Sequence, residues 1–222
     1  MIVGDDWARD RMRAHVEESA RVARQLADAC GEDILRVAAT MADTFRAGGK
    51  VLLCGNGGSA ADCQHVAAEL VSRLTADFAR PGLPALALTT DTSFLTAYAN
   101  DCGYDGVFAR QVQALGKSQD LLIGISTSGG SANVLHAVRA ARGIGMRTVA
   151  LIGEGGALRD VSDITISIPS TFTQYVQEAH LMVEHILCDL VERHLFGLLG
   201  AAQGAREAWE SMRGDARGDE LA

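Results

Sequence analysis

The sequence predicts an α/β fold in which a doubly wound, five-stranded parallel sheet is flanked by helices and preceded by N-terminal helices. Five short apolar segments alternate with segments of helical periodicity, which is typical of consecutive βαβ units. Two of them, Val51–Cys54 and Leu121–Ile125, are apolar throughout, as strands buried on both faces are. A glycine- or serine-rich loop follows each of these two strands directly, which indicates ligand sites at one edge of the sheet.

Two N-terminal helices come first in the expected order of elements. Residues 6–29 carry apolar side chains at helical spacing among charged ones, and a second helix from about residue 33 to 47 stops at Gly48-Gly49. Strands and helices then alternate: strands at 50–54, 85–89, 120–125, 147–152 and 164–168, and helices at 60–74, 92–98, 105–115 and 131–143.

A long helix is expected to close the fold, from about residue 173 to 198. It is apolar on more than one stripe, which favours cover on several sides, including by another subunit. We interpret residues 1–200 as one domain, with the N-terminal helices in 1–48 and the core and last helix in 49–200. The remainder, 201–222, is rich in Gly, Ala and charged residues and is expected to be a flexible tail.

The composition excludes several classes of function. The 222 residues are 48% hydrophobic and carry a net charge of −8 without a basic block, so a nucleic-acid partner is not expected. No segment approaches 18 uninterrupted apolar residues, so no membrane span is expected. Five scattered cysteines without a C-x-x-C pair, and a charged N-terminus, predict reduced thiols and a cytoplasmic location.

The serine loop at residues 126–131 carries the strongest chemical signal. Its sequence, Ser-Thr-Ser-Gly-Gly-Ser, lies between a strand and a helix start, where backbone N–H groups and the helix dipole favour an anion. A capped turn would explain one or two of these residues but not four hydroxyls in six positions. The loop therefore predicts a phosphate site.

The glycine loop, Gly55-Asn56-Gly57-Gly58-Ser59, follows the first strand in the same way. Its glycines allow a sharp turn and a close approach to a ligand. It fits neither the dinucleotide fingerprint nor a Walker A loop. We expect both loops to face one crevice. Asn100-Asp101 follows the strand at 85–89 and fits either a plain helix end or the same crevice.

Polar residues also interrupt two helices in places where a core would be expected. His65 and Glu69 stand four residues apart on one helix face, a spacing that an ordinary surface pair also has. The last helix carries Gln177, His180 and His185 among apolar residues. Such a group could hold a divalent metal or transfer protons. Spacing alone favours Gln177 with His180, because Gln177 and His185 lie about 12 Å apart along the helix. Three further histidines fit an ordinary surface: His15, His136 and His194.

Taken together, these segments resemble the sugar isomerase (SIS) family over residues 40–197, and within it the branch that isomerises heptose phosphates. The motifs that carry the resemblance are C-G-N-G-G-S-A-A-D-C-Q-H-V-A-A-E at 54–69, L-T-T-D-T-S at 88–93, N-D-x-G-Y at 100–104, R-Q-V-Q-A-L-G at 110–116, G-I-S-T-S-G-G-S-A-N-V at 124–134 and Q-E-A-H-x-x-x-E-H at 177–185. Gly130 is a departure, because Asn or Lys is often found there in the family.

The resemblance implies a role for each candidate residue. The phosphate would be held by Ser126, Thr127, Ser128 and Ser131. The sugar site would be lined by Asn56, Gly57, Gly58, Ser59, Asn100 and Asp101, with Glu69 and Gln177. One zinc ion per subunit would be bound by His65, Glu69, Gln177 and His185. Glu69 and His185 would also form the acid–base pair, His180 would be structural, and the protein would be a homotetramer.

The implied reaction is the aldose–ketose isomerisation of sedoheptulose 7-phosphate to D-glycero-D-manno-heptose 7-phosphate through an enediol, the first step of nucleotide-activated heptose biosynthesis. An alternative is a non-catalytic SIS assembly factor that binds the replication initiator protein. Such relatives lack the equivalents of Glu69 and His185, which this chain keeps. A SIS transcription regulator would need a helix-turn-helix domain, and the residues before the first strand are too few and too acidic for one.

Overall fold

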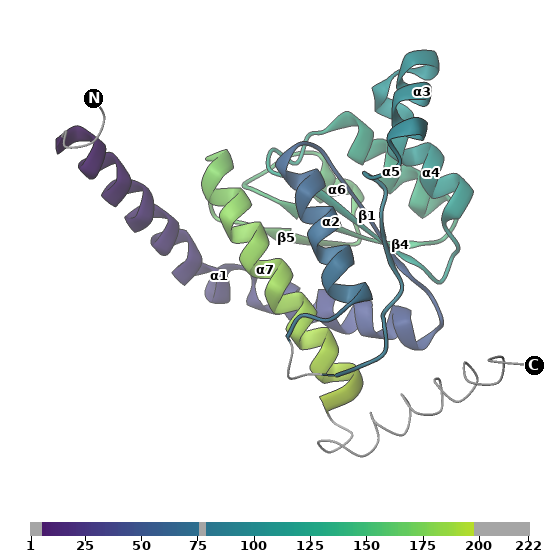
Figure 1. Cartoon of the computed structure of the whole chain (residues 1–222), viewed down its shortest axis with the longest axis horizontal. Helices are drawn as coiled ribbons and strands as arrows, with labels where there is room; N and C mark the ends of the chain where they lie inside the picture. Colours follow the sequence, from purple (N-terminus) through teal and green to yellow (C-terminus); the bar gives the residue numbers. More distant parts are fainter. Residues whose placement is uncertain (1–5, 76–78, 198–222) are drawn as a thin grey trace, which may run out of the picture.

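The computed structural model describes residues 6–75 and 79–197, and in them five parallel strands form one sheet with helices on both faces (Figure 1). The strand order is β2-β1-β3-β4-β5. The strands are β1 (Val51–Gly55), β2 (Ala85–Ala87), β3 (Leu121–Ser126), β4 (Arg147–Ile152) and β5 (Ile164–Ser167). The α-helices are α1 (Asp6–Arg46), α2 (Gly58–Val71), α3 (Thr92–Cys102), α4 (Val107–Leu115), α5 (Ala132–Gly143), α6 (Leu158–Val161) and α7 (Thr173–Glu192). The predicted fold class is confirmed.

The core lies on both faces of the sheet. Because successive strand residues point to opposite faces, Leu52 packs with α4 and α5 on one side, while Leu53 packs with α1, α2 and α7 on the other. All five residues of β1 and all six of β3 are buried. Their continuous apolar sequence reflects this burial on both faces. The loops that follow these strands are therefore attached to fully buried strands in the centre of the sheet.

The two predicted N-terminal helices are one helix of 41 residues, α1, so the expected break near residue 31 is wrong. Gly31 destabilises a helix by about 1 kcal/mol relative to alanine, but it does not end one. Cys30 and Ile34 on either side of it are buried against the core, and the Cys30 thiol donates to the Ser167 carbonyl (3.1 Å). Packing on both sides thus carries the helix through the glycine, and its N-terminal half projects beyond the sheet (Figure 1).

Other element ends differ from the prediction by a few residues. The edge strand β2 stops at Ala87 instead of residue 89, α2 ends at Val71 instead of residue 74, and the short helix α6 was not predicted. The last helix leaves α-geometry at Glu192 and continues as a π-helical turn, η2 (Arg193–Gly197). The predicted tail at 201–222 lies outside the described residues, and the proposed domain limits stay a prediction.

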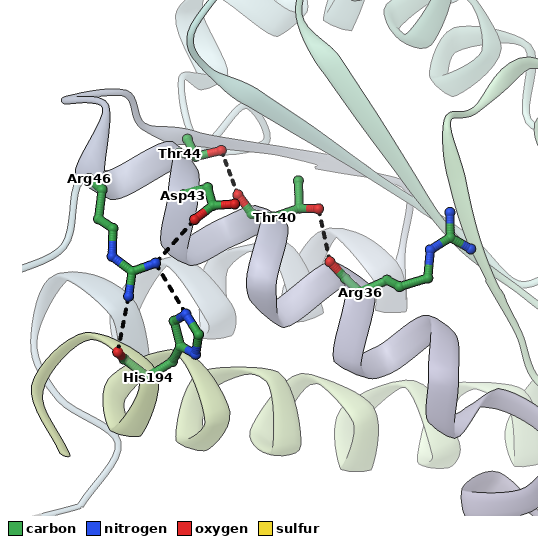
Figure 2. A network of polar contacts seen from close by, with 6 residues as sticks. All are labelled: Arg36, Thr40, Asp43, Thr44, Arg46 and His194. Atoms are coloured by element: carbon green, nitrogen blue, oxygen red, sulfur yellow. Dashed lines mark hydrogen bonds and ion pairs between the residues drawn. The ribbon is translucent and has the colours of Figure 1, made fainter. Parts of the chain in front are cut away.

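The end of α1 is bonded to the turn that follows α7 (Figure 2). Arg46 donates to Nε2 of His194 (3.1 Å), to the His194 carbonyl (3.2 Å) and to Asp43 (3.1 Å). Because a guanidinium only donates, Nε2 of His194 must accept, which places the ring proton on Nδ1. His194 therefore joins two helices and is more than a surface residue. On the same helix, the buried Thr44 and Thr40 hydroxyls each donate to the carbonyl four residues earlier.

Asp120 joins the starts of β1 and β3 at the amino edge of the sheet. Its buried carboxylate accepts hydrogen bonds from the Lys50 amide (2.9 Å), the Lys50 ammonium (2.5 Å) and the Lys117 amide (2.8 Å). Burial alone would raise the pKa of Asp120, but these bonds to the charged form outweigh it and lower the pKa below its usual value.

We predict that Asp120→Asn lowers the free energy of unfolding at pH 7 by about 2 kcal/mol, the typical contribution of hydrogen bonds to a charged group. Because the folded pKa is depressed, this stabilisation is present above the unfolded pKa and is lost as the pH falls through the folded one. Urea unfolding at pH 7 and at acid pH measures both effects. Equal stability of the variant and the wild type at pH 7 would contradict the prediction.

Candidate active site at the carboxyl edge of the sheet

The two predicted loops lie next to each other because β1 and β3 are parallel neighbours, paired from Val51↔Leu121 to Gly55↔Ile125. Both loops leave the sheet at its carboxyl edge, where parallel folds place their ligands. Two hydrogen bonds join them directly: the Asn56 amide donates to Oδ1 of Asn133 (2.9 Å), and the Asn133 amide donates to Oδ1 of Asn56 (2.8 Å). Asn133 was not among the predicted site residues.

The serine loop presents its hydroxyl groups to one another. The Ser126 hydroxyl lies 2.9 Å from that of Ser131 and 3.4 Å from that of Ser128. Ser131 occupies the N-cap position of α5, yet its side chain makes no capping hydrogen bond. The Ser131 hydroxyl therefore points into the loop and does not cap the helix. Ser128 is exposed, and Thr127 is half-buried beside it.

A third glycine-rich loop, Gly153–Gly156, supports the serine loop and was missed in the sequence. It follows β4, the next strand in the sheet, and the Gly153 amide donates to the Thr127 carbonyl (3.1 Å). Gly129 has φ +63°, and a Cβ on Gly156 would collide with the Ser128 carbonyl. The two backbones therefore pack without room for a side chain. The signal was available, because a strand followed by Gly-Glu-Gly-Gly is the same pattern as in the two recognised loops.

The glycine loop is in contact with α7. Gly57 has φ +56°, a left-handed conformation that glycine adopts without strain. A Cβ on Gly58 would overlap the side-chain amide of Gln177. The absence of a side chain at Gly58 therefore lets Gln177 approach the loop from a helix more than 100 residues later in the sequence. Ser59, by contrast, is buried, with 3% of its surface exposed.

His65 on α2 and His185 on α7 face each other across the same site. Their Nε2 atoms lie 2.8 Å apart, with the rings near perpendicular at 72°. Glu69 lies on the other side of the His65 ring, with Oε1 3.8 Å from Nδ1. The structure thus brings three of the four predicted zinc ligands into one group, and Gln177 is on the same helix as His185.

The donor set fits a divalent metal in part. Imidazole nitrogens are donors that zinc prefers, but these two lie 2.8 Å apart, which is a hydrogen-bond distance. Glu69, however, approaches the opposite ring nitrogen of His65, and among the described residues no group of three or more His, Cys, Asp or Glu side chains is placed to hold a metal ion. To bind one zinc ion, His65 and His185 would have to move apart to about 3.3 Å, the separation of two tetrahedral nitrogen ligands, and Glu69 and Gln177 would have to turn toward them.

His180 and Glu184 lie on the buried side of α7, away from this pair. His180 is fully buried, and burial lowers its pKa to about 4, so that it is neutral at pH 7. Burial, together with the nearby negative charge of Asp62, raises the pKa of Glu184 to about 8. The Glu184 carboxylate has no hydrogen-bond partner among the described residues, whereas the His180 ring is directed at the backbone of Ile152. The structure separates His180 from His185, in keeping with a structural role for His180.

The remaining candidates lie farther out. Asn100 and Asp101 are inside α3, near its end, and both are exposed. The Asn100 amide donates to Asp101 (2.8 Å), and among the described residues neither bonds to the two loops. His15, expected to be an ordinary surface residue, lies 2.6 Å from Glu178, whose carboxylate also accepts from Ser19. This contact attaches α1 to α7 one residue beyond Gln177.

The sequence and the fold both match known proteins. Residues 14–153 match the family model described as SIS domain. The chain belongs to the SIS domain family.

Within this family it groups with the phosphoheptose isomerases. The phosphoheptose isomerase of Roseiflexus sp. (strain RS-1) is 52% identical over 191 residues, covering 86% of this chain and 94% of the relative. That of Burkholderia pseudomallei (strain K96243) is 53% identical over 175 residues, covering 78% and 82%. Among solved structures, phosphoheptose isomerase from Neisseria gonorrhoeae has a TM-score of 0.78 at 42% identity, covering 83% of this chain and 98% of that one. The Francisella tularensis structure has a TM-score of 0.79 at 38% identity, covering 83% and 97%.

We predict that Gly58→Ala impairs activity without unfolding the protein. The new methyl group displaces the Gln177 amide, and kcat/KM should fall about tenfold, because small misplacements at a reacting centre are costly. Steady-state kinetics measures the effect. Gly143→Ala is the matched control, because a Cβ there meets nothing within 4 Å. Equal kcat/KM for the two variants would show that the contact with Gln177 is irrelevant.

Proposed function

We propose that this sugar-phosphate isomerase converts sedoheptulose 7-phosphate to D-glycero-D-manno-heptose 7-phosphate, the first step of nucleotide-activated heptose biosynthesis. The observation that carries the proposal is the placement of the hydroxyl-lined serine loop and the His65–His185 pair around one sheet edge. Relatives that are about half identical over most of the chain are named phosphoheptose isomerase, which supports the same substrate here.

The serine loop would bind the substrate phosphate through hydroxyl groups and the first amides of α5. Hydroxyls and amides donate to the phosphate oxygens, and the positive end of the helix dipole favours the negative charge. The phosphate is far from the reacting carbons, so its binding energy positions the chain and takes no part in bond breaking. The sugar would then extend along the glycine loop toward α2 and α7.

Glu69 and His185 would move the protons. Glu69 accepts the proton from C1 of the ketose, which leaves an enediolate, and returns it to C2 to give the aldose. His185 transfers the second proton between the oxygens on C1 and C2. No atom is gained or lost, because the reaction only relocates two protons. The half-buried carboxylate of Glu69 lies on the same side of α2 as His65, which faces His185.

One zinc ion per subunit belongs to the proposal. His65 and His185 would hold it through Nε2, with Glu69 and Gln177 as the remaining ligands. When bound, zinc would polarise the sugar oxygens as a Lewis acid. A cytoplasmic location is also proposed, supported by five cysteines that are all free thiols. No helix in the described part of the chain is long and apolar enough to cross a membrane.

The direct test is to incubate the purified protein with sedoheptulose 7-phosphate and to follow the aldoheptose phosphate by NMR. Turnover at an enzymatic rate supports the proposal. Binding of the sugar phosphate without any conversion would refute it and would favour a non-catalytic role.

Three substitutions assign the roles on α2 and α7. We expect Glu69→Gln to lower kcat at least about 100-fold, since one general base contributes that much or more. His185→Ala should lose both turnover and bound zinc, measured by metal analysis. His180→Ala should keep measurable activity, because its side chain is buried away from the site. If His180→Ala lost the metal and His185→Ala retained it, the assignment would be reversed.

A homotetramer is the proposed assembly. Large apolar side chains are exposed on the projecting half of α1, at Trp7, Met12 and Val16, and along α7, at Leu181, Met182 and Ile186. Such faces are typical of surfaces that pack against another copy. Light scattering should give about four times the chain mass of 23.4 kDa. A stable and active monomer would contradict the assembly.

A further inference from the structure

A buried ion pair outside the predicted site connects the two helices that carry its proton-transfer residues. Arg80, in the segment between α2 and β2, has 5% of its surface exposed, and its partner Glu192, the last residue of α7, has 2%. Nε of Arg80 donates to Oε1 of Glu192 (2.8 Å), and Nη2 lies 2.7 Å from the same oxygen. Glu192 also accepts the Leu74 amide (3.1 Å).

The rest of the guanidinium is bonded to the end of α2. Nη2 donates to the Glu69 carbonyl (2.7 Å), and Nη1 donates to the carbonyls of Leu70 (2.6 Å) and Pro81 (2.9 Å). The last carbonyls of a helix have no partner within the helix. Arg80 supplies such a partner to the Glu69 and Leu70 carbonyls, and the Leu70 carbonyl also accepts the Leu83 amide (2.9 Å). The planar, forked donors of Arg80 reach all these acceptors at once, which a lysine could not do.

Both partners of this ion pair are linked to proposed proton-transfer residues. Glu192 lies seven residues after His185, two helical turns along the same face of α7, or about 10 Å. At the other end of the contact, Arg80 holds the backbone of Glu69 itself. The α2–α7 interface therefore carries two polar contacts, His65 with His185 and Arg80 with Glu192, and any rotation or slide that breaks the second would also change the first. Arg46 and His194 secure the turn after Glu192 from the side of α1 (Figure 2).

Stability alone does not account for the pair. Burying two charges costs as much as their attraction returns, and apolar residues of similar volume are often at least as stable. The forked guanidinium of Arg80 can meet its acceptors in only one orientation, and this fixes the position of α2 relative to α7.

We propose that Arg80 is a positioning residue of the isomerase: through Glu192 and the Glu69 carbonyl, it fixes the register of α2 against α7 and so the placement of Glu69 relative to His185. The inference rests on the proposed function. It adds to that function a residue that reaches the site only through the backbone carbonyl of Glu69. A positioning residue of this kind should affect kcat more than KM, because the substrate phosphate is bound by a different part of the molecule.

The test compares Arg80→Lys, Arg80→Gln and Glu192→Gln with Asp120→Asn. Asp120 is a buried carboxylate that forms an ion pair with the half-buried Lys50 at the opposite edge of the sheet, so its loss destabilises the fold without reaching α2 or α7. Each protein is assayed with sedoheptulose 7-phosphate at a temperature well below its own unfolding midpoint. We expect kcat to fall about 10- to 100-fold in the Arg80 and Glu192 variants, with KM changed less than about threefold. Asp120→Asn should keep the wild-type kcat.

Hydrogen exchange of the amides at residues 70–74 supplies a readout that is independent of turnover and metal. Protection should fall in the Arg80 and Glu192 variants and stay unchanged in Asp120→Asn. Lower protection with unchanged kcat would show that the pair only stabilises the helix end, and a raised KM with unchanged kcat would place its effect on substrate binding; either result overturns the inference. If Arg80→Gln fails to fold, Glu192→Gln and Arg80→Lys decide the question. A wild-type protein without turnover would refute the proposed function instead.

Discussion

The parallel pairing of β1 with β3 is the constraint on which the rest of the structure depends. Both strands are buried on both faces, so their backbone groups can be satisfied only by each other and by the neighbouring strands. With the register from Val51↔Leu121 to Gly55↔Ile125, the glycine loop and the serine loop must leave the sheet side by side. The Asn56–Asn133 pair then holds them together. The proposed phosphate and sugar sites thereby become parts of one surface.

Helices α2 and α7 bring the proposed proton-transfer residues to that surface. Helix α2 starts from the glycine loop, so the position of His65 follows from β1 within two turns. Helix α7 follows β5, the strand at the opposite edge of the sheet from β2. Its position is set by packing, because Val176, Val183 and Leu187 are buried against the core. Polar side chains of α7 also hold it in place. Glu178 is bonded to α1, Glu192 is bonded to Arg80, and Gln177 reaches the space left by Gly58. The helix that carries the proposed acid His185 is thus held largely by contacts outside the site itself.

Sequence reasoning succeeded where the signal is local. The five strands, most of the helices and the two loops were predicted within a few residues, since apolar periodicity and turn chemistry are properties of short segments. The continuous α1 was missed because its continuity through Gly31 comes from packing on both sides. The Gly153–Gly156 loop was missed although its pattern was present, and Arg80 was missed because no motif marks it. Arginine before Pro-Gly in a connecting segment carries no sign of burial.

The sequence by itself determined the fold class, the positions of the serine and glycine loops, and the kinds of side chain available for the proposed proton transfer, because each of these depends on neighbours along the chain. It left open which histidine of the last helix serves the site. His180 and His185 are five residues apart, which turns them about 140° from one another around the helix axis. Only the packing of α7 sets that rotation, and it buries His180 in the core while directing His185 to His65 on α2.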